Sequence, residues 1–367
     1  MKPKYIVHID YGSRGNSGFY IERILQVTSA KSHVRAYVHS EFPISQSTAR
    51  IIKIFDRWSE RIGSPKIKAA IKAVDIYLCF LKIFFDVRTL SKVYDVQLYC
   101  AFFQSFHVYG WFFKIVIKYC NLNVTVHDAV ELAHTYPSFI MSERDNTLRY
   151  AHRLIVHSEA SQVILRHLEI PMSLILFPVE NRPMPMVRQR GSLVKFLFIG
   201  HLRKEKGIIN LIKAWSLLNP ADVSAANLTI AGNDVLNMGS DAVNLPNCTT
   251  KFGYIDDEEF EALIQDTDYV VLPYEGGTNS GVLSIATSCE KPCITSNIPC
   301  FSQSQYFLED LSFKNPGDLS PMIARVIRSH VGNYDGYVDF LRLKNIDYQK
   351  DFDEDINQMY QLAQKRR

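Results

Sequence analysis

The sequence has little net charge, no paired cysteine motif and no long uninterrupted apolar run. Its formal net charge of +3 is too small to indicate a nucleic-acid partner. The seven cysteines are odd in number and scattered, mostly within apolar stretches such as residues 77–80, so we interpret them as reduced core thiols. Cys289, Cys293 and Cys300 lie close together but lack a metal-ligand spacing, and we predict no metal site.

No apolar run reaches the roughly 18 uncharged residues that a membrane span requires. The apolar stretch near the N-terminus ends at Asp10, too early for a secretory signal peptide, so we expect a cytoplasmic protein. In the strongly apolar segment 69–87, the charged residues fall near one face of a predicted helix. The opposite face carries Ile76, Tyr77, Phe80, Leu81, Phe84 and Phe85. We expect that face to pack in the core, with contact to a membrane surface as the alternative.

A chain of 367 residues suggests two domains, and 47% hydrophobic with 22% charged residues is typical of a globular enzyme. Short apolar runs alternate with helical patterns in both halves, which predicts an α/β fold with two Rossmann-like βαβ domains. Residues 178–185 contain three prolines and cannot continue a helix or a central strand. We predict a first domain over 1–180, a linker over 181–192 and a second domain over 193–345. A helix over 346–367 is expected to pack back on the first domain.

A glycine-rich loop follows the first predicted strand, which covers residues 5–9. The loop contains Gly12, Gly15 and Gly18, and we expect a helix to begin near Phe19. Closely spaced glycines let backbone N–H groups approach a ligand, although this spacing is not the dinucleotide fingerprint. An ordinary flexible turn between a strand and a helix is an equally good interpretation.

Histidines follow two further predicted strands of the first half. His107 comes after the strand over 96–100, and His127 and Asp128 come directly after the strand over 123–126. Because the carboxyl ends of parallel strands point toward a ligand crevice, His127 and Asp128 are candidate site residues. For His107 a structural role is the better interpretation.

Helix signals are sharp at two positions and extend over a long segment at a third. Ser158 is expected to cap a helix that starts at Glu159, and Asp256 is expected to cap the helix that follows it. Residues 43–87 are expected to be mainly helical.

A cationic loop opens the second half. The apolar run 196–199 ends at Gly200, and Arg203 and Lys206 precede a helical pattern that starts near Ile208. In such a strand–loop–helix unit the ligand lies at the carboxyl end of the strand, near the helix N-terminus. Fixed cations there favour a diphosphate over a neutral ligand. Solvated cations in an ordinary turn are the alternative.

A second glycine-rich turn, residues 275–281, follows a predicted buried strand over 269–274. Its last four residues are Thr278, Asn279, Ser280 and Gly281. Glycines, hydroxyls and an amide at a helix N-terminus are typical of an anion site, with a tight loop that binds nothing as the alternative.

These segments together resemble the family-4-like glycosyltransferases with the GT-B fold. The resemblance rests on residues 198–207 (FIGHLRKEKG), 228–232, 252–256, 268–274 and 278–294 in the second half, and on 124–128 and 155–158 in the first. The turn at 278–281 is similar to that of a branch with a Thr-Gln-Ser-Gly-type sequence. The resemblance implies a GT-B architecture, in which the two domains face each other across a ligand crevice.

The resemblance also implies residue roles. The second domain would bind a nucleotide sugar, and the first would bind a saccharide acceptor. Arg203 and Lys206 would hold the donor diphosphate and stabilise its growing negative charge. Other donor-binding positions would be Gly15, Gly18, Gly200, Tyr254, Ile255, Thr278, Asn279, Ser280 and Gly281. His127 would contact the donor sugar.

One position departs from the family pattern. Many members carry two glutamates seven residues apart, the second of which binds the ribose, and here Ile285 stands at the second position. We expect a reaction that needs neither a metal nor a cofactor besides the nucleotide sugar. Retention of configuration follows from the resemblance alone, whereas inversion would need a base such as Asp128 or His127.

The expected acceptor is a lipid-linked saccharide of surface-polysaccharide biosynthesis, at the inner face of the cell membrane. Two other functions remain open from the sequence. One is a non-catalytic GT-B scaffold that binds a nucleotide or a saccharide, and the other is a sugar-nucleotide epimerase.

Overall fold

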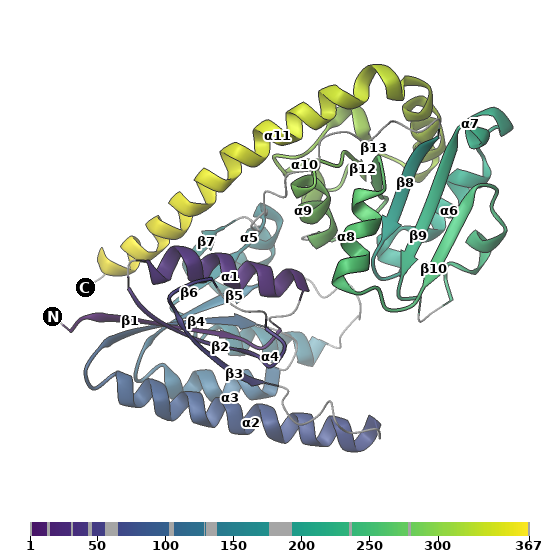
Figure 1. Ribbon diagram of the computed structural model, residues 1–367. Coiled ribbons are helices and arrows are strands. Elements are labelled where there is room, and N and C mark those ends of the chain that lie inside the picture. The colour runs from purple at the N-terminus through teal and green to yellow at the C-terminus, as the bar shows by residue number, and fades with distance from the viewer. Residues whose placement is uncertain are drawn as a thin grey trace. The chain divides into compact units, whose positions relative to one another are not determined.

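The computed structural model describes residues 2–12, 15–30, 32–42, 46–55, 65–102, 106–127, 129, 138–175, 193–234, 237–277 and 280–365. The chain divides into two compact units, each built around one β-sheet (Figure 1). The first unit comprises Met1–Glu131, Thr135–Pro178 and Phe352–Arg367, and the second comprises Leu132–His134 and Val179–Asp351. The predicted linker over 181–192 lies outside the described residues.

The first unit has a seven-stranded sheet in the order β3-β2-β1-β4-β5-β6-β7, with every neighbouring pair parallel. The strands are β1 (Lys4–Asp10), β2 (His33–His39), β3 (Arg50–Phe55), β4 (Asp95–Phe102), β5 (Asn121–Val126), β6 (Arg153–Val156) and β7 (Met172–Leu174). The helices are α1 (Gly15–Ser29), α2 (Pro65–Leu90), α3 (Phe106–Val116), α4 (Ser138–Leu148), α5 (Glu159–Leu165) and the 3-10 turn η2 (Arg166–Leu168). The strand order reverses between β1 and β4.

The second unit has a six-stranded parallel sheet in the order β10-β9-β8-β11-β12-β13. Its strands are β8 (Val194–Ile199), β9 (Ala226–Gly232), β10 (Cys248–Phe252), β11 (Tyr269–Leu272), β12 (Cys293–Ser296) and β13 (Ser312–Phe313). The α-helices are α6 (Ile208–Ser216), α7 (Pro220–Ser224), α8 (Asp257–Gln265), α9 (Gly281–Ser288), α10 (Pro299–Ser302) and α11 (Leu319–Lys365). The 3-10 turns are η3 (Lys204–Lys206), η4 (Ser240–Asn244), η5 (Glu309–Leu311) and η6 (Pro316–Asp318). The predicted α/β class with two parallel-sheet domains is confirmed.

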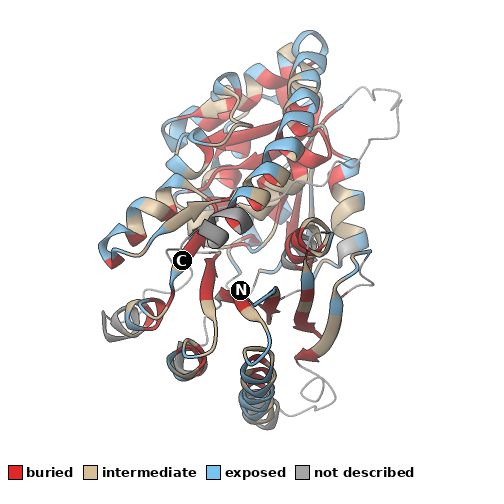
Figure 2. Cartoon of the chain, turned by 90° about the vertical axis from the view of Figure 1, so that its left-hand side faces the viewer, coloured by how far each residue is buried: buried red, intermediate tan, exposed pale blue. Residues whose placement is uncertain are grey.

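Both sheets are buried between helices, because successive side chains of a strand point to opposite faces. In the first unit, Phe80 of α2 and Phe112 of α3 join alternate strand residues such as Leu98 in one apolar core. In the second unit, Trp215 of α6 packs edge-on against Phe196 of β8, with 5.9 Å between ring centroids. Figure 2 shows the strands largely in the colour of buried residues, while the helices alternate between buried and exposed sides.

Helix α11 is continuous, and its last part belongs to the first unit. Phe352, Ile356 and Met359 are buried. Arg23 of α1 donates to both carboxylate oxygens of Asp353, at 2.8 and 2.9 Å. A bidentate guanidinium–carboxylate pair fixes orientation as well as proximity. The end of α11 is therefore an integral part of the first unit.

Two local expectations need correction. The helix expected within residues 43–87 is present as α2, but Arg50–Phe55 forms the edge strand β3, which was not predicted although its three isoleucines favour a strand. Helix α1 begins at Gly15 rather than near Phe19. Gly15 and Gly18 therefore lie in the first turn of a helix and not in an extended glycine loop.

The expected core face of α2 was also partly wrong. Ile76 and Phe80 are buried and Phe84 is partly buried, but Tyr77, Leu81 and Phe85 are exposed by 43%, 38% and 52%. The buried face instead includes Cys79, Ile83 and Val87. This helix is apolar around most of its circumference, so periodicity alone does not select the side that packs.

Gly232, at the end of β9, gives a test of the second unit. It has a φ of +136°, and a Cβ placed on it would overlap the carbonyl oxygen of Gly200. We expect Gly232→Ala to lower the free energy of unfolding of this unit by about 3 kcal/mol, since strain and a backbone clash must both be relieved. Denaturant unfolding measures the change, followed by fluorescence in a background where Trp58 and Trp111 are phenylalanine, so that Trp215 alone reports on this unit.

The matched control is Gly336→Ala in the same unit. Gly336 lies within α11, and a Cβ there meets no atom within 4 Å. Alanine should leave stability unchanged or raise it by up to ~1 kcal/mol. If both substitutions changed stability equally, the close approach at Gly232 would not be the constraint that we describe.

Candidate functional site

The turns at one edge of the second sheet are tied together. Parallel strands all end at the same edge, and the strand order here reverses between β8 and β11, which is where open α/β sheets bind ligands. The backbone N–H of Gly253, after β10, donates to the carbonyl of Gly232 at 3.0 Å. The N–H of Gly200 donates to Ala231 at 3.0 Å, and Leu202 donates to Asn233 at 3.0 Å. These bonds join the ends of β10, β9 and β8 in a row.

The loop after β8 is held against the end of β11. Gly207 has a φ of +69°, and a Cβ on it would overlap the carbonyl oxygen of Pro273. The N–H of Glu275 donates to the carbonyl of Glu205 at 2.9 Å. Only glycine meets both demands at position 207, because it adopts the left-handed conformation and has no side chain. The predicted strand–loop–helix unit is therefore held in place at two glycines. Gly200 is hydrogen-bonded to Ala231, and Gly207 packs against Pro273.

Three cations, Arg203, Lys204 and Lys206, occupy this loop. Arg203 precedes the turn η3 and lies 3.8 Å from Glu205, with about a third of its side chain exposed (38%). The Lys206 ammonium lies over the ring of Tyr274, 3.8 Å from its centroid. Burial, together with the charges of Arg203 and Lys206, lowers the pKa of His201. The loop therefore concentrates positive charge at the switch point of the sheet, as an anion site requires.

The N-terminus of α9 lies beside these cations. Ser280 caps the helix by accepting from the N–H of Leu283 at 3.2 Å, and its hydroxyl donates to the Tyr274 hydroxyl at 3.3 Å. Gly281 is the first helical residue, so unpaired N–H groups of the first turn point toward the same edge. The structure thus brings Gly200, Lys206, Ser280 and Gly281 to one edge of the sheet. Lys206 and Ser280 both contact Tyr274 there. Thr278 and Asn279 lie outside the described residues.

The turn after β10 carries the two residues predicted to flank a base. The Tyr254 side chain is 87% exposed, and Ile255 packs against a core cluster that includes Leu197 and Ile264. The hydrogen bond from Gly253 to Gly232 joins this turn to the same sheet edge. Tyr254 therefore presents an open aromatic face next to the turns that hold the cations.

In the first unit, the carboxyl end of β1 carries a buried acid. Asp10 is only 1% exposed and, with His8, Tyr20 and Tyr99, lines a small cavity of about 20 Å³. Burial raises the pKa of Asp10 to about 7, partly offset by a hydrogen bond from the backbone of Gly12. Burial likewise lowers the pKa of His8 to about 3. At pH 7 His8 is therefore neutral and Asp10 is close to the midpoint of its titration.

His127 is the candidate residue of the first unit whose contacts are clearest. It directly follows β5, and its Nδ1 lies 3.1 Å from Nε2 of His157, which directly follows β6. Nδ1 of His157 lies 2.7 Å from the carbonyl oxygen of Ile175. The ring of Tyr20 stands edge-on to both imidazoles, at 5.2 and 5.0 Å between centroids. The two histidines are stacked at 5.0 Å.

This arrangement fixes the protonation of both rings. Burial lowers the pKa of His157 to about 4 and places that of His127 well below its usual range, so both are neutral at pH 7. A carbonyl oxygen can only accept, so Nδ1 of His157 carries the proton and its Nε2 accepts from Nδ1 of His127. The lone pair of His127 is then on Nε2. Nε2 is therefore the ring nitrogen of His127 that can accept a hydrogen bond.

Some predicted residues cannot be placed beside His127. Asp128 lies outside the described residues, and the side chain of His107 is not described. Gly15 and Gly18 lie in the first turn of α1. His157 and Tyr274 were not predicted. His157 ends its strand just as His127 does, so the rule that placed His127 at the carboxyl edge could also have identified His157.

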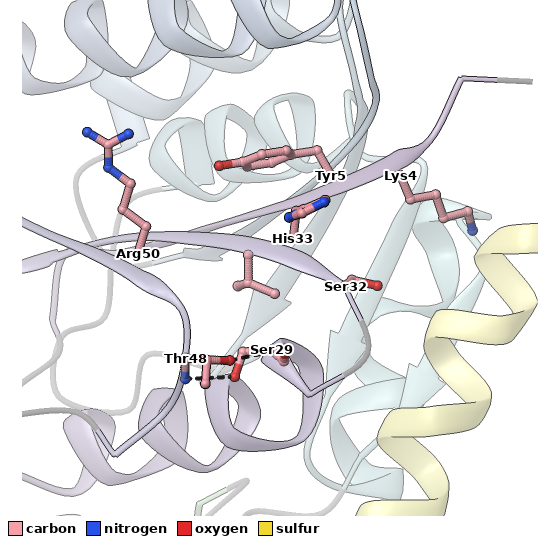
Figure 3. A pocket seen from close by; sticks show the side chains of 8 residues that line it. Lys4, Tyr5, Ser29, Ser32, His33, Thr48 and Arg50 are labelled. Carbon is pink, nitrogen blue, oxygen red and sulfur yellow. Dashed lines mark hydrogen bonds between the residues drawn. The ribbon is translucent and has the colours of Figure 1, made fainter.

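A larger hollow of about 820 Å³ lies elsewhere in the first unit (Figure 3). Its lining includes Lys4 and His33, the first residues of β1 and β2, and Arg50, the first residue of β3. The hydrogen bonds drawn in Figure 3 join Thr48 to Ser29. These residues gather at the amino ends of the strands. The hollow is therefore at the opposite edge from Asp10 and His127, and parallel sheets do not usually bind ligands there.

Substitution of His157 tests the tautomer of His127. In His157→Gln the amide oxygen accepts from His127 and the amide NH₂ donates to Ile175, so we expect the Nδ1–H tautomer to persist. In His157→Leu both bonds are lost, and we expect a mixture of tautomers. Two-bond ¹H–¹⁵N correlation spectra report which ring nitrogen carries the proton. A pure Nδ1–H tautomer in His157→Leu would show that His157 does not set it.

Asp10 predicts a pH dependence of stability. Its carboxyl pKa rises from 3.8 in the unfolded chain to about 7 in the folded protein. Between these values the folded state retains a proton that the unfolded state releases, so this group lowers stability as the pH rises. We expect Asp10→Asn to unfold like wild type near pH 4 and to be more stable by roughly 2–4 kcal/mol above pH 7. Urea unfolding of wild type and Asp10→Asn from pH 4 to above pH 7 measures the difference in their free energies of unfolding. A difference that does not change with pH would contradict the raised pKa of Asp10.

Comparison with known proteins adds sequence and structural likenesses to this geometry. Residues 188–304 match the family model described as "Glycosyl transferases group 1". This segment contains the cationic loop, the Tyr254 turn and the start of α9. No curated protein matches the chain.

Solved structures of similar fold cover nearly the whole chain. HepE from Anabaena, in complex with UDP-glucose, is 15% identical, with a TM-score of 0.67 over 98% of both chains. Sucrose-phosphate synthase from Thermosynechococcus elongatus is 16% identical, with a TM-score of 0.65 over 98% of both chains. WaaG, a glycosyltransferase involved in lipopolysaccharide biosynthesis, is 11% identical, with a TM-score of 0.59 over 93% of this chain and 94% of that one. The chain therefore has the two-domain α/β fold known as GT-B, and residues 188–304 match a glycosyltransferase family within it.

Proposed function

We propose that the protein is a glycosyltransferase that moves a sugar from a nucleotide-diphosphate donor to a saccharide acceptor. The observation that carries this proposal is the placement of Lys206 and the N-terminal cap of α9 against the same Tyr274, at the switch point of the second sheet, with Arg203 in the same loop as Lys206. The glycosyltransferase family match spans both elements, and the similar HepE structure holds UDP-glucose.

The chemistry of glycosyl transfer explains why cations are needed. Breaking the bond between the sugar and the diphosphate leaves negative charge on the leaving group. Arg203 and Lys206 stabilise that charge more in the transition state than in the bound donor, which lowers the barrier. The N–H groups at Gly281 and the Ser280 hydroxyl add donors from the helix terminus. We propose that these groups supply the charge stabilisation without a metal.

The first unit supplies groups for the sugar and the acceptor in this proposal. In the proposal His127 contacts a hydroxyl of the donor sugar, and in an inverting reaction it would be a candidate base. In a retaining reaction the leaving diphosphate itself takes the acceptor proton, and we favour that route from the resemblance to retaining transferases. Asp128 is the second candidate base. Gly15 and Gly18 offer backbone N–H groups at the start of α1.

We further propose that the acceptor is a lipid-linked saccharide of surface-polysaccharide biosynthesis. The likeness in fold to WaaG, which acts in lipopolysaccharide biosynthesis, supports this class of acceptor. In the proposal the protein works at the cytoplasmic side of a membrane. Among the described residues, no helix is both long and apolar enough to cross a membrane.

One observation favours a second function. Ile285 occupies the α9 position at which many related transferases bind the ribose through a glutamate. A GT-B module that binds a nucleotide without transferring a sugar would tolerate this change. Such a module would bind the nucleotide and give no glycoside in the presence of an acceptor, whereas the transferase would give both. An epimerase would convert the donor with no acceptor present.

Nucleotide binding is tested by a thermal-shift panel of UDP, GDP, TDP and their sugar conjugates. A ligand at ~100 times its dissociation constant stabilises the folded protein by about 2.7 kcal/mol and so raises the melting midpoint. We expect one nucleotide to stabilise wild type, and Arg203→Ala to lose most of this shift. Lys213→Ala is the matched control, because Lys213 is an exposed cation of α6 in the same unit.

Two results would contradict the assignment. If Arg203→Ala responded to the nucleotide as wild type does, the cationic loop would not be the diphosphate site. If Lys213→Ala lost the shift to the same extent, the effect would come from net charge rather than from the site.

A further inference from the structure

The outer side of α2 carries an apolar stripe that the core of the first unit does not use. Val74, Tyr77, Leu78, Leu81 and Phe85 are exposed by 60%, 43%, 60%, 38% and 52%. Their spacing of three, one, three and four residues places them on one face of the helix. This stripe extends for about 17 Å along the axis. It lies opposite the residues of α2 that pack in the core, such as Cys79 and Ile83.

Helix α3 continues this surface. The two helices lie side by side on one face of the first sheet (Figure 1). Trp111 of α3 is 39% exposed, and its ring centroid lies 6.2 Å from that of Tyr77. We name the stripe on α2 together with Trp111 the α2–α3 apolar face. A contiguous apolar surface of this kind on a globular domain indicates a partner.

Cations surround the α2–α3 apolar face. Lys114 is exposed and lies three residues after Trp111, on the same side of α3, and Lys118 is exposed in the turn that follows this helix. Arg88 is exposed and continues the stripe on α2 beyond Phe85, and Lys92 is exposed in the turn that follows this helix.

The acids of these segments are turned toward other groups. Residues 74–92 contain only Asp75 and Asp86, and residues 109–118 contain no acid. Asp86 accepts from the Tyr37 hydroxyl at 2.6 Å and from Lys82 at 3.1 Å, and Asp75 lies 4.0 Å from the thiol of Cys79. The rim of the face is therefore positive.

We propose that the α2–α3 apolar face docks on the surface of an anionic lipid bilayer. Aliphatic and aromatic side chains enter the boundary between headgroups and acyl chains, and tyrosine and tryptophan favour that depth. The surrounding lysines and arginine are attracted to anionic headgroups. A second copy of the chain fits less well, because symmetric pairing of this face would bring the same cations together. The stripe lies along the membrane plane and does not cross the bilayer.

This inference extends the proposed function, because a lipid-linked acceptor lies at such a surface, but it does not depend on catalysis. Sedimentation of the full-length protein with vesicles needs neither donor nor acceptor. The vesicles are phosphatidylcholine alone and phosphatidylcholine mixed with phosphatidylglycerol. We expect binding to the mixed vesicles that weakens with added salt, and much weaker binding to the neutral ones.

Substitutions test whether vesicle binding occurs through the α2–α3 apolar face. We expect Leu78→Ser with Phe85→Ser to weaken partitioning about ten-fold or more, because two side chains that enter the interface are removed. Lys114→Glu with Lys118→Glu should weaken binding to the anionic vesicles only. Val163→Ser is the matched control, since Val163 is 72% exposed on α5 in the same unit. All of these side chains are exposed, so each variant should keep the wild-type melting midpoint.

The fluorescence of Trp111 gives a second readout. Brominated lipids should quench the emission of wild type, and Trp111→Phe should lose the quenched component. The proposal is overturned if wild type binds neither vesicle, or if Leu78→Ser with Phe85→Ser binds as wild type does. It is also overturned if light scattering shows a dimer that the same double variant dissociates, because the face would then be a subunit interface.

Discussion

The candidate site depends on the close approach of backbones at the carboxyl edge of the second sheet. Gly232 lies against Gly200, and Gly207 lies against Pro273, each with a positive φ and no room for a side chain. These two contacts set how near the loop after β8 comes to the turns on either side of it. The cations of that loop and the helix terminus of α9 share one edge because the backbones beneath them cannot move apart without losing this packing.

The two units differ in how they manage charge. In the second unit, Arg203 and Lys206 remain charged and partly open, with glutamate and an aromatic ring as modest partners. In the first unit, burial keeps His127 and His157 neutral and shifts the titration of Asp10 to about pH 7. A diphosphate is bound by charge, whereas a sugar hydroxyl is bound by neutral donors and acceptors of defined direction. The charged site of the second unit therefore suits the diphosphate of the proposed donor, and the neutral histidines of the first unit suit its sugar.

The sequence predicted features that depend on local chemistry. Ser158 and Asp256 cap their helices as expected, each accepting from the backbone N–H three residues later. It did not predict features that depend on which surfaces meet. The strand β3 was missed beside a long apolar helix, the packed side of α2 was predicted only in part, and the bond from His127 to His157 joins residues 30 positions apart. The spacing of apolar residues indicates which side of a helix is apolar, but which neighbouring element packs on that side depends on the tertiary fold.

The last part of α11 has a consequence for how the chain is made. Phe352, Ile356 and Met359 complete the apolar interior of a unit whose first strand begins at Lys4. During synthesis the ribosome releases nearly the whole second unit before these residues emerge. The first unit to be translated is therefore the last to be completed, and its nascent form exposes apolar surface throughout that interval. A chaperone that binds the nascent chain would therefore bind the first unit before the second and would be released from it only after the end of α11 has emerged.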